Sequence, residues 1–235
     1  MPGFAQQSLS SAGKTTRGKL RYETIVWDWN GTLLDDVGLA IRVMNDLLVE
    51  HGHPTLDQET YAHVFEFPVQ RYYETIGFDL ETHDFASLST RFCDAFEAGL
   101  VAQKREAELF PDVNTVLSEL HRHAHFILSN TEQTALDRML AEYELTHHFE
   151  GIYGLGNNRA TGKAGIGEDL VTAHVVDRDR TILIGDTTHD ADVAKTLGMD
   201  CLLVATGHNA RHRLEAAGVP VVDSLREIPE HLAVA

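Results

Sequence analysis

Apolar and polar residues form two kinds of segment along the chain. A short apolar run from Thr24 to Trp27 ends abruptly in the polar sequence Asp28-Trp29-Asn30-Gly31-Thr32, which is typical of a buried strand that runs into a loop. Apolar residues then recur at helical spacing from Val37 to Leu48, and Gly52 provides a stop. The pattern therefore predicts a buried strand followed by an amphipathic helix.

The remaining chain divides into a helical part and an alternating part. Residues 57–106 contain no convincing strand pattern and are predicted to be helical, with breaks near Pro68 and Gly77. After Pro111, short apolar runs alternate with amphipathic segments. The runs lie at 126–128, 152–153, 182–184, 202–204 and 219–222, and the predicted helices lie at 131–144, 164–176 and 190–197. This alternation is the signature of a parallel sheet covered by helices.

The first strand stands apart from the others, which predicts an α/β, Rossmann-like parallel-sheet core interrupted by an inserted helical cap. We assign residues 23–36 and 109–235 to the core and residues 37–108 to the cap. Residues 1–22 have no hydrophobic period and contain basic but no acidic residues, so we interpret them as a disordered tail.

Composition and charge narrow the range of functions. The 235 residues are 43% hydrophobic, which is ordinary for a globular protein. Lys and Arg number 19 against 36 Asp and Glu, so the formal charge of −17 argues against a nucleic-acid or membrane-surface partner. No apolar run is long enough to span a bilayer, and the two cysteines form no Cys-x-x-Cys pair, which favours a cytoplasmic location. The sequence leaves the oligomeric state open.

Polar side chains follow several of the predicted strands directly. In open α/β sheets, ligands bind outside the carboxyl ends of the strands. One carboxylate alone is equally typical of a helix cap, but acids from two strands, a hydroxyl and a lysine suffice for Mg²⁺-assisted phosphoryl chemistry. The residues at these positions are Asp28, Asn30, Ser129, Asn130, Asp186, Thr187, Thr188 and Asp190, and Lys163 precedes a predicted helix.

The order and spacing of these residues resemble the haloacid dehalogenase superfamily, in particular its phosphatase branch with a helical cap after the first strand. The resemblance covers about residues 22–225 and implies hydrolysis of a small phosphorylated metabolite with Mg²⁺. The motifs that carry it are Asp28-Trp29-Asn30-Gly31-Thr32-Leu33, Ser129-Asn130, Lys163 and Gly185-Asp186-Thr187-Thr188-His189-Asp190.

The resemblance also implies a role for each acidic position. Asp28 corresponds to the nucleophile that accepts the phosphoryl group. Asp28, the main-chain carbonyl of Asn30 and Asp186 correspond to protein ligands of Mg²⁺. Asp190 belongs with this metal group, where it would fix metal-bound water or Lys163.

The phosphate-binding positions follow from the same resemblance. Ser129 and Lys163 are expected to hold the phosphoryl oxygens, with Asn130 beside them and Thr32 supporting the first loop. From the residues alone, Ser129 and Asn130 are also typical of a strand-to-helix turn.

The chain departs from the phosphatase pattern at residue 30, where the family has a second Asp that acts as general acid and base. The amide of Asn30 can form hydrogen bonds but cannot donate a proton to a leaving group near neutral pH. The sequence leaves four explanations open: a leaving group that needs little protonation, a donor elsewhere such as His189 or a cap residue, slow catalysis, or a phosphate-ligand binding or regulatory relative without turnover.

The cap is expected to cover the site and to select the substrate. Its segment from Phe65 to Tyr73 is similar to that of phosphoglycolate-phosphatase-like members. Arg71 in this segment could pair with an anionic substrate group or with a neighbouring glutamate on the surface. His208 and His212 are interpreted as surface residues.

Overall fold

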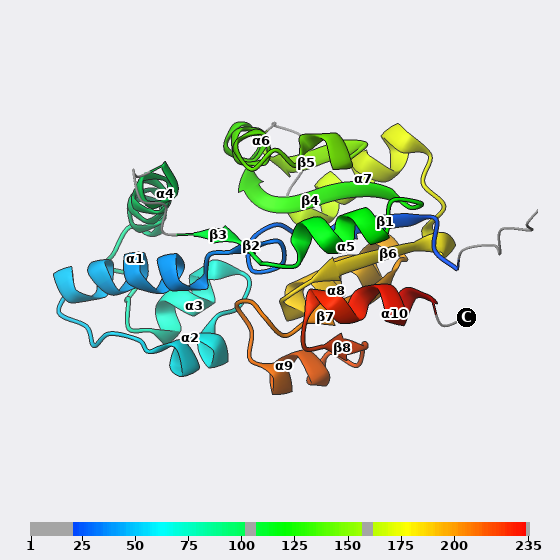
Figure 1. Ribbon diagram of the computed structural model, residues 1–235. Helices are drawn as coiled ribbons and strands as arrows, with labels where there is room; N and C mark the ends of the chain where they lie inside the picture. The colour runs from blue at the N-terminus through cyan, green and yellow to red at the C-terminus, as the bar shows by residue number, and fades with distance from the viewer. Residues whose placement is uncertain (1–20, 102–106, 157–161, 234–235) are drawn as a thin grey trace, which may run out of the picture.

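The centre of the protein is a six-stranded sheet in which every neighbouring pair of strands is parallel (Figure 1). The computed structural model describes residues 21–101, 107–156 and 162–233. The strand order is β5-β4-β1-β6-β7-β8, so the first strand lies in the middle. The strands are β1 (Thr24–Trp27), β4 (Ala124–Glu132), β5 (Gly151–Leu155), β6 (Thr181–Gly185), β7 (Asp200–Val204) and β8 (Val221–Val222). The α/β, Rossmann-like fold class is confirmed.

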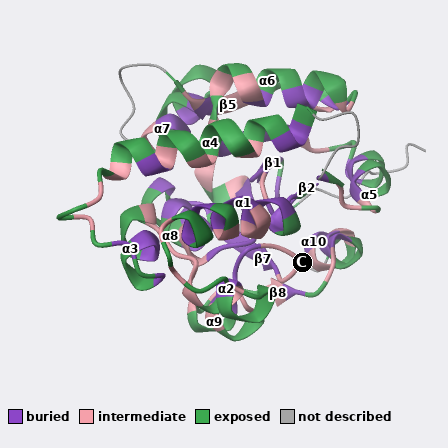
Figure 2. Ribbon diagram, turned by 90° about the vertical axis from the view of Figure 1, so that its left-hand side faces the viewer, coloured by how far each residue is buried: buried purple, intermediate pink, exposed green. Residues whose placement is uncertain are grey.

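Helices cover both faces of this sheet. Alternate residues of β1 point to opposite faces, so Ile25 and Trp27 pack in one hydrophobic cluster and Val26 in the other. The first cluster includes α5 (Val113–Glu119), α6 (Gln133–Glu142) and α10 (Ile228–Ala233), and the second includes α7 (Lys163–His174), α8 (Thr188–Leu197) and α9 (Arg211–Ala216). Short 3₁₀ helices lie at Thr146–His148, Arg178–Arg180 and Leu225–Glu227. Figure 2 shows the buried strands between helices whose outer faces are exposed.

The segment between β2 (Leu34–Asp35) and β3 (Glu108–Leu109) leaves the core and returns to it. These two strands pair antiparallel, so they bring the start and the end of the segment together. The described helices within it are α1 (Val37–Glu50), α2 (Gln58–Val64), α3 (Val69–Thr75) and α4 (Phe85–Val101). They share a hydrophobic cluster of their own, which includes Met44, Tyr61 and Leu88. In Figure 1 this helical unit lies beside the sheet rather than over its faces.

Two local expectations are wrong. Strand β4 continues to Glu132 with a shift in its pairing to β5, so Ser129 and Asn130 lie within the strand rather than after it. The expected tail reached residue 22, but Tyr22 is 4% exposed and its hydroxyl donates to Asp200 at 2.6 Å. Residues 1–20 lie outside the described residues.

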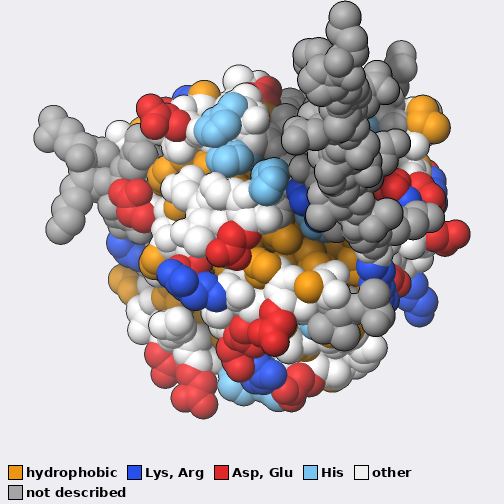
Figure 3. Space-filling model, turned by 45° about the vertical axis from the view of Figure 1, so that its right-hand side comes forward, with side chains coloured by type: hydrophobic (Ala, Val, Ile, Leu, Met, Phe, Trp, Pro, Cys, Tyr) orange, Lys and Arg blue, Asp and Glu red, His pale blue; other side chains and the backbone are white. Residues whose placement is uncertain are grey.

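The surface shows how the charge is distributed. On the face drawn in Figure 3, acidic and basic side chains are interspersed, and no continuous basic patch is visible on the described residues there. Among the described residues, none of the helices has the length and apolar character needed to cross a bilayer.

Candidate active site

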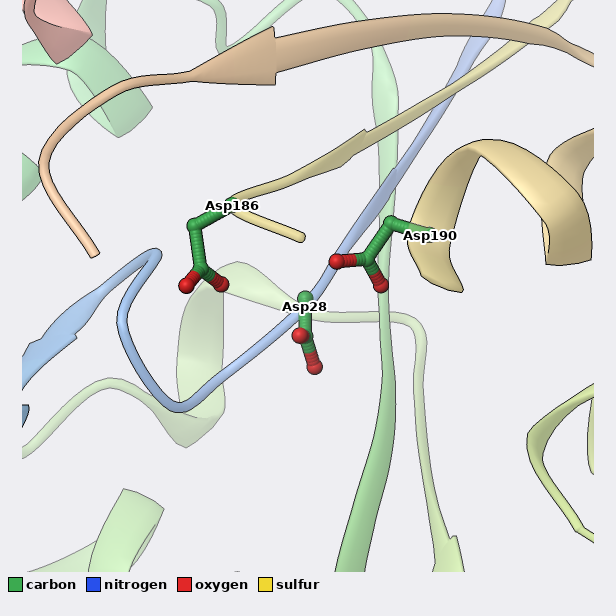
Figure 4. Close-up of side chains that lie close together, drawn as sticks. All are labelled: Asp28, Asp186 and Asp190. Atoms are coloured by element: carbon green, nitrogen blue, oxygen red, sulfur yellow. The ribbon is translucent and has the colours of Figure 1, made fainter. Parts of the chain in front are cut away.

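Three aspartates converge at the carboxyl ends of β1 and β6. Asp28 follows β1, Asp186 follows β6, and Asp190 lies in the first turn of α8 (Figure 4). Each offers a carboxylate oxygen within 4.8 Å of the others. β1 and β6 are adjacent parallel strands, with Trp27 opposite Ile184, so the residues after them must lie close together.

The start of helix α8 fixes the position of Asp190. The Thr187 backbone N–H and hydroxyl both donate to Asp190 Oδ2, at 3.0 and 2.7 Å. This capping box satisfies donors at the helix N-terminus, which explains why the helix begins at Thr188. Asp190 Oδ1 is engaged separately, because it accepts from Lys163 Nζ at 2.5 Å.

Lys163 joins two of the aspartates. It is the first residue of α7, and its ammonium lies 2.8 Å from Asp28 Oδ1 as well as 2.5 Å from Asp190 Oδ1. Burial alone would lower the pKa of Lys163, but the two carboxylates outweigh it and hold the pKa above its ordinary value. Burial likewise acts to raise the pKa of Asp190, yet Lys163 and the Thr187 hydrogen bonds leave it below its ordinary value. These contacts favour a role for Asp190 in holding Lys163.

Asp186 is held from two other segments. Thr32 Oγ1 donates to Asp186 Oδ1 at 2.9 Å, and the His208 backbone N–H donates to Asp186 Oδ2 at 2.7 Å. A Cβ atom at Gly31 or Gly207 would overlap this carboxylate, so glycine is needed for both loops to approach it. Thr32, expected at the phosphate, is fully buried against Asp186.

The carboxylates carry more negative charge than the nearby lysine balances. Burial raises the pKa of Asp28 to about 8; Asp190 and Asp186 add to this shift, and Lys163 opposes it. Burial also raises the pKa of Asp186 to about 6, although His208 opposes the shift. A dication would relieve both effects, and carboxylate oxygens are its preferred ligands. The residues therefore fit a hard divalent cation held by Asp28 and Asp186.

The side chain of Asn30 has partners on both sides. Its amide nitrogen donates to Asp36 Oδ2 at 2.9 Å, and its amide oxygen accepts from Thr131 Oγ1 at 2.6 Å. Asp36 is 1% exposed and also accepts from the Gly31 backbone N–H at 2.8 Å. The phosphatase pattern has a carboxylate at residue 30 itself. In this chain the carboxylate of Asp36 lies one hydrogen bond away from residue 30.

His208 is not a surface residue, contrary to expectation. It is 6% exposed, its Nε2 lies 3.3 Å from Asp36 Oδ1, and its Nδ1 lies 2.8 Å from the Tyr61 hydroxyl of the cap. Burial would lower the pKa of His208, but Asp36, Asp186 and Asp28 outweigh this and raise it to about 9. His208 therefore lies buried between cap and core, where the neighbouring carboxylates favour its protonated form.

The other residues that were predicted to belong to the site differ in burial and in their contacts. Ser129 is 1% exposed, donates to Thr131 Oγ1 and accepts from the Thr131 N–H, both at 3.1 Å. Asn130 is half-buried beside it in β4. Arg71 is exposed on α3, and among the described residues it makes neither of the expected glutamate pairs. His189 is half-buried and stacks on the Phe67 ring, with the ring centroids 4.5 Å apart.

Four residues around the carboxylates were not predicted as site residues from the sequence: Asp36, Thr131, His208 and Tyr61. His208 follows β7 in the sequence Thr206-Gly207-His208, so the rule of polar residues after apolar runs finds it when it is applied to that strand. Tyr61 belongs to an ordinary apolar helix face, and nothing in the sequence signals its contact with the core.

Known proteins resemble this chain in fold and in sequence. A family model described as haloacid dehalogenase-like hydrolase matches residues 25–204. The chain therefore belongs to the haloacid dehalogenase-like hydrolase family and is a hydrolase of the phosphatase class, with relatives that are named phosphoglycolate phosphatase.

Three comparisons give the degree of similarity. Phosphoglycolate phosphatase of Caulobacter vibrioides is 25% identical over 232 residues, which cover 92% of this chain and 93% of that protein. Tyrosine-protein kinase PtkA of Mycobacterium tuberculosis is 24% identical over 216 residues, covering 88% of this chain and 70% of the relative. A haloacid dehalogenase-like protein of unknown function from Agrobacterium tumefaciens superposes with a TM-score of 0.76 at 24% identity, covering 90% of this chain and 98% of that one.

Proposed function

We propose that this phosphatase hydrolyses a small phosphomonoester in two steps through Asp28, with Mg²⁺ as its cofactor. The observation that carries the proposal is the Asp28 carboxylate. Its side chain is 12% exposed, whereas Asp186 and Asp190 are fully buried, and Lys163 Nζ lies 2.8 Å away. Asp28 is therefore the carboxylate in this cluster that a substrate can reach.

In the first step, an Asp28 oxygen forms a bond to phosphorus while the bond from phosphorus to the leaving oxygen breaks. The leaving oxygen keeps the electron pair. In the second step, a water oxygen attacks the phosphorus of the aspartyl phosphate, and the bond to Asp28 breaks. The products are inorganic phosphate and the regenerated carboxylate, and the proton of the attacking water passes to solvent.

The neighbouring residues prepare this reaction. Lys163 stays protonated, holds Asp28 in place and offers positive charge to the phosphoryl oxygens, while Asp190 fixes Lys163. Ser129, whose hydroxyl donates to Thr131 Oγ1 in this structure, and Asn130 lie in the last half of β4 and are candidate donors to the phosphoryl oxygens. Mg²⁺ held by Asp28, Asp186 and the carbonyl of Asn30 would neutralise negative charge on the phosphoryl group.

Asn30 restricts the range of substrates. Because an amide cannot protonate the leaving oxygen, turnover should depend strongly on how stable that oxygen is as an anion. Acyl and aryl phosphates should therefore react faster than alkyl phosphates. Phosphoglycolate, named for the Caulobacter relative, belongs in the test panel as an alkyl phosphate with a second anionic group, for which exposed Arg71 in the cap is a candidate partner.

A second candidate function is binding of a phosphate ligand without turnover. The observation that favours it is also Asn30, whose amide nitrogen and oxygen are both engaged by protein partners. This function requires that a phosphorylated ligand raise the thermal unfolding temperature while no phosphate is released.

Phosphate release by the purified chain, with and without Mg²⁺, tests the proposal on acyl, aryl, sugar and alkyl phosphates. Asp28→Asn should abolish release, and Asp190→Asn should weaken it strongly. Asp192→Asn is the matched control, because Asp192 is exposed on the same helix as Asp190. Release that persists in Asp28→Asn would refute the mechanism. A silent native chain that is stabilised by phosphorylated ligands would support the binding function.

A further inference from the structure

A chain of hydrogen-bonding and ionic contacts connects the cap to residue 30. The Tyr61 hydroxyl of α2 lies 2.8 Å from His208 Nδ1, and His208 Nε2 lies 3.3 Å from Asp36 Oδ1. The other oxygen of Asp36 accepts from the Asn30 amide at 2.9 Å. Tyr61, His208 and Asp36 are all buried, at 2%, 6% and 1% exposure, so water competes little with these contacts.

The contacts of Asn30 define the orientation of its amide group. A carboxylate only accepts, so the amide nitrogen must face Asp36. The amide oxygen then faces the Thr131 hydroxyl, which donates to it at 2.6 Å. An amide nitrogen carries two hydrogens, so one N–H bond is used by Asp36 and the second is left for another acceptor.

The loop that carries His208 contacts the cap and the carboxylates together. Its His208 N–H donates to Asp186, while the Asn209 amide and the Arg213 guanidinium donate to the Phe65 carbonyl of the cap at 2.9 and 2.6 Å. Figure 1 shows this segment, between β7 and α9, passing beside α2 and α3. A shift of the cap would therefore disturb the surroundings of His208.

We propose that Tyr61, His208 and Asp36 are positioning residues that hold Asn30 as a fixed hydrogen-bond donor to the leaving oxygen and tie its orientation to the cap. The proposal rests on the proposed function, because the leaving oxygen belongs to that reaction. Asp36 accepts one N–H of Asn30 and directs the other, the His208 ring contacts the second oxygen of Asp36, and Tyr61 anchors His208 from the cap. A carboxyl group therefore lies beside residue 30, at Asp36, rather than at residue 30 itself.

Tyr72 provides a matched control for Tyr61. The two rings are in contact at 5.8 Å between centroids, and both side chains are 2% exposed. The Tyr72 hydroxyl is buried without a hydrogen-bond partner among the described residues. Tyr61→Phe and Tyr72→Phe therefore remove the same atom from neighbouring rings, but only the first breaks the contact with His208.

The experiment compares these two variants by two measurements. The ¹⁵N side-chain amide signals of Asn30, assigned by their loss in Asn30→Ser, report its hydrogen bonds without requiring turnover. Tyr61→Phe should move these signals and lower kcat on the best substrate about 3- to 10-fold, the effect of one hydrogen bond, while KM changes less than about twofold. Tyr72→Phe should change neither the signals nor kcat.

The outcomes separate this proposal from the proposed function. Asn30 signals and a kcat that match the native protein in Tyr61→Phe would overturn the positioning chain. If no phosphate is released by any of the chains, the phosphatase mechanism fails, and the amide signals alone decide whether Tyr61 orients Asn30. Asp36→Asn is the second variant if Tyr61→Phe does not fold, and unchanged Asn30 signals in it would also overturn the proposal.

Discussion

Replacing Asn30 by Asp tests the electrostatics of the site directly. In Asn30→Asp, an oxygen takes the place of the nitrogen that donates to Asp36 Oδ2 at 2.9 Å. Two carboxylates then face each other in a partly buried region, and one hydrogen bond is lost. Thr131 can still donate to the remaining oxygen at residue 30, so the change is confined to the contact with Asp36.

The size of the effect follows from Coulomb's law. Two unit charges about 3 Å apart repel by about 5 kcal/mol at an effective dielectric constant of about 20. His208 lies 3.3 Å from the other oxygen of Asp36 and offsets part of this repulsion. We therefore expect Asn30→Asp to lower the free energy of unfolding by about 2–4 kcal/mol when both carboxyls are ionised.

The penalty should depend on pH with a definite sign. Mutual repulsion raises the pKa of one carboxyl of the pair in the folded variant, so that carboxyl keeps its proton at a pH where it is ionised in the unfolded chain. Stability is then lost as pH rises from about 4, the ordinary carboxyl value, through the raised folded value. The penalty should be small at about pH 4 and full at about pH 8.5.

Urea unfolding of the native chain and of Asn30→Asp at these two pH values measures the penalty. Asn114→Asp, an exposed position on α5, controls for the added charge. The double variant Asn30→Asp with Asp36→Asn exchanges amide and carboxylate and should recover most of the loss. A penalty that is absent, or equal at both pH values, would show that Asn30 and Asp36 are not in contact as described.

The same variant also has a kinetic prediction. If turnover of alkyl phosphates is limited by the missing acid, Asn30→Asp should raise kcat on them by about 10²-fold or more, because general acid catalysis is worth that much. Acyl phosphates should gain less, since their leaving group needs little protonation. An equal gain on both substrate classes would argue against a missing acid as the cause.

Two further changes test the core of the site and of the fold. Lys163→Met leaves two buried carboxylates without their cation and should lower the free energy of unfolding, measured in urea, by about 3–5 kcal/mol. The control Lys195→Met, at an exposed position, should lower it by less than about 0.5 kcal/mol. Equal losses in the two variants would contradict the buried ion pairs. Burial lowers the pKa of His125 to about 4, and its ring nitrogens contact the Trp27 indole N–H and the Leu120 carbonyl at 3.0 Å. Below about pH 6.5 the unfolded chain therefore binds more protons than the folded chain, and the free energy of unfolding of the native protein should fall by about 3 kcal/mol between about pH 6.5 and pH 4. His125→Gln should remove this loss. Parallel curves of unfolding free energy against pH for the two proteins would disprove the prediction.

Much of the core could be predicted from the sequence because its signals are local. The apolar run at 24–27 became the central strand β1, and the apolar run at 182–184 became its neighbour β6. Strands buried on both faces are apolar throughout, so their ends can be read where polar residues begin. This is why Asp28 and Asp186 were found together with Lys163 at the start of its helix.

The partners of these residues depended on the tertiary structure. His208 contacts Asp36 and Tyr61, which lie far from it in sequence and on other elements of the fold. Hydrophobic period carries no information about such contacts, because it reports which face of an element is buried and not what that face meets. Asp36 directly follows another acid, Asp35. It was not recognised as a site residue because its contacts with Asn30 and His208 are likewise invisible in the sequence pattern.

The sequence by itself determined that residue 30 is an amide, and with it that this position cannot transfer a proton. Only the tertiary structure decided what surrounds that amide: a buried carboxylate on one side and a hydroxyl on the other. The physical reason is that the ionisable character of a side chain is covalent and local. Its hydrogen bonds and its electrostatic environment are set by residues that the fold brings together from β4, α2 and the loops after β2 and β7.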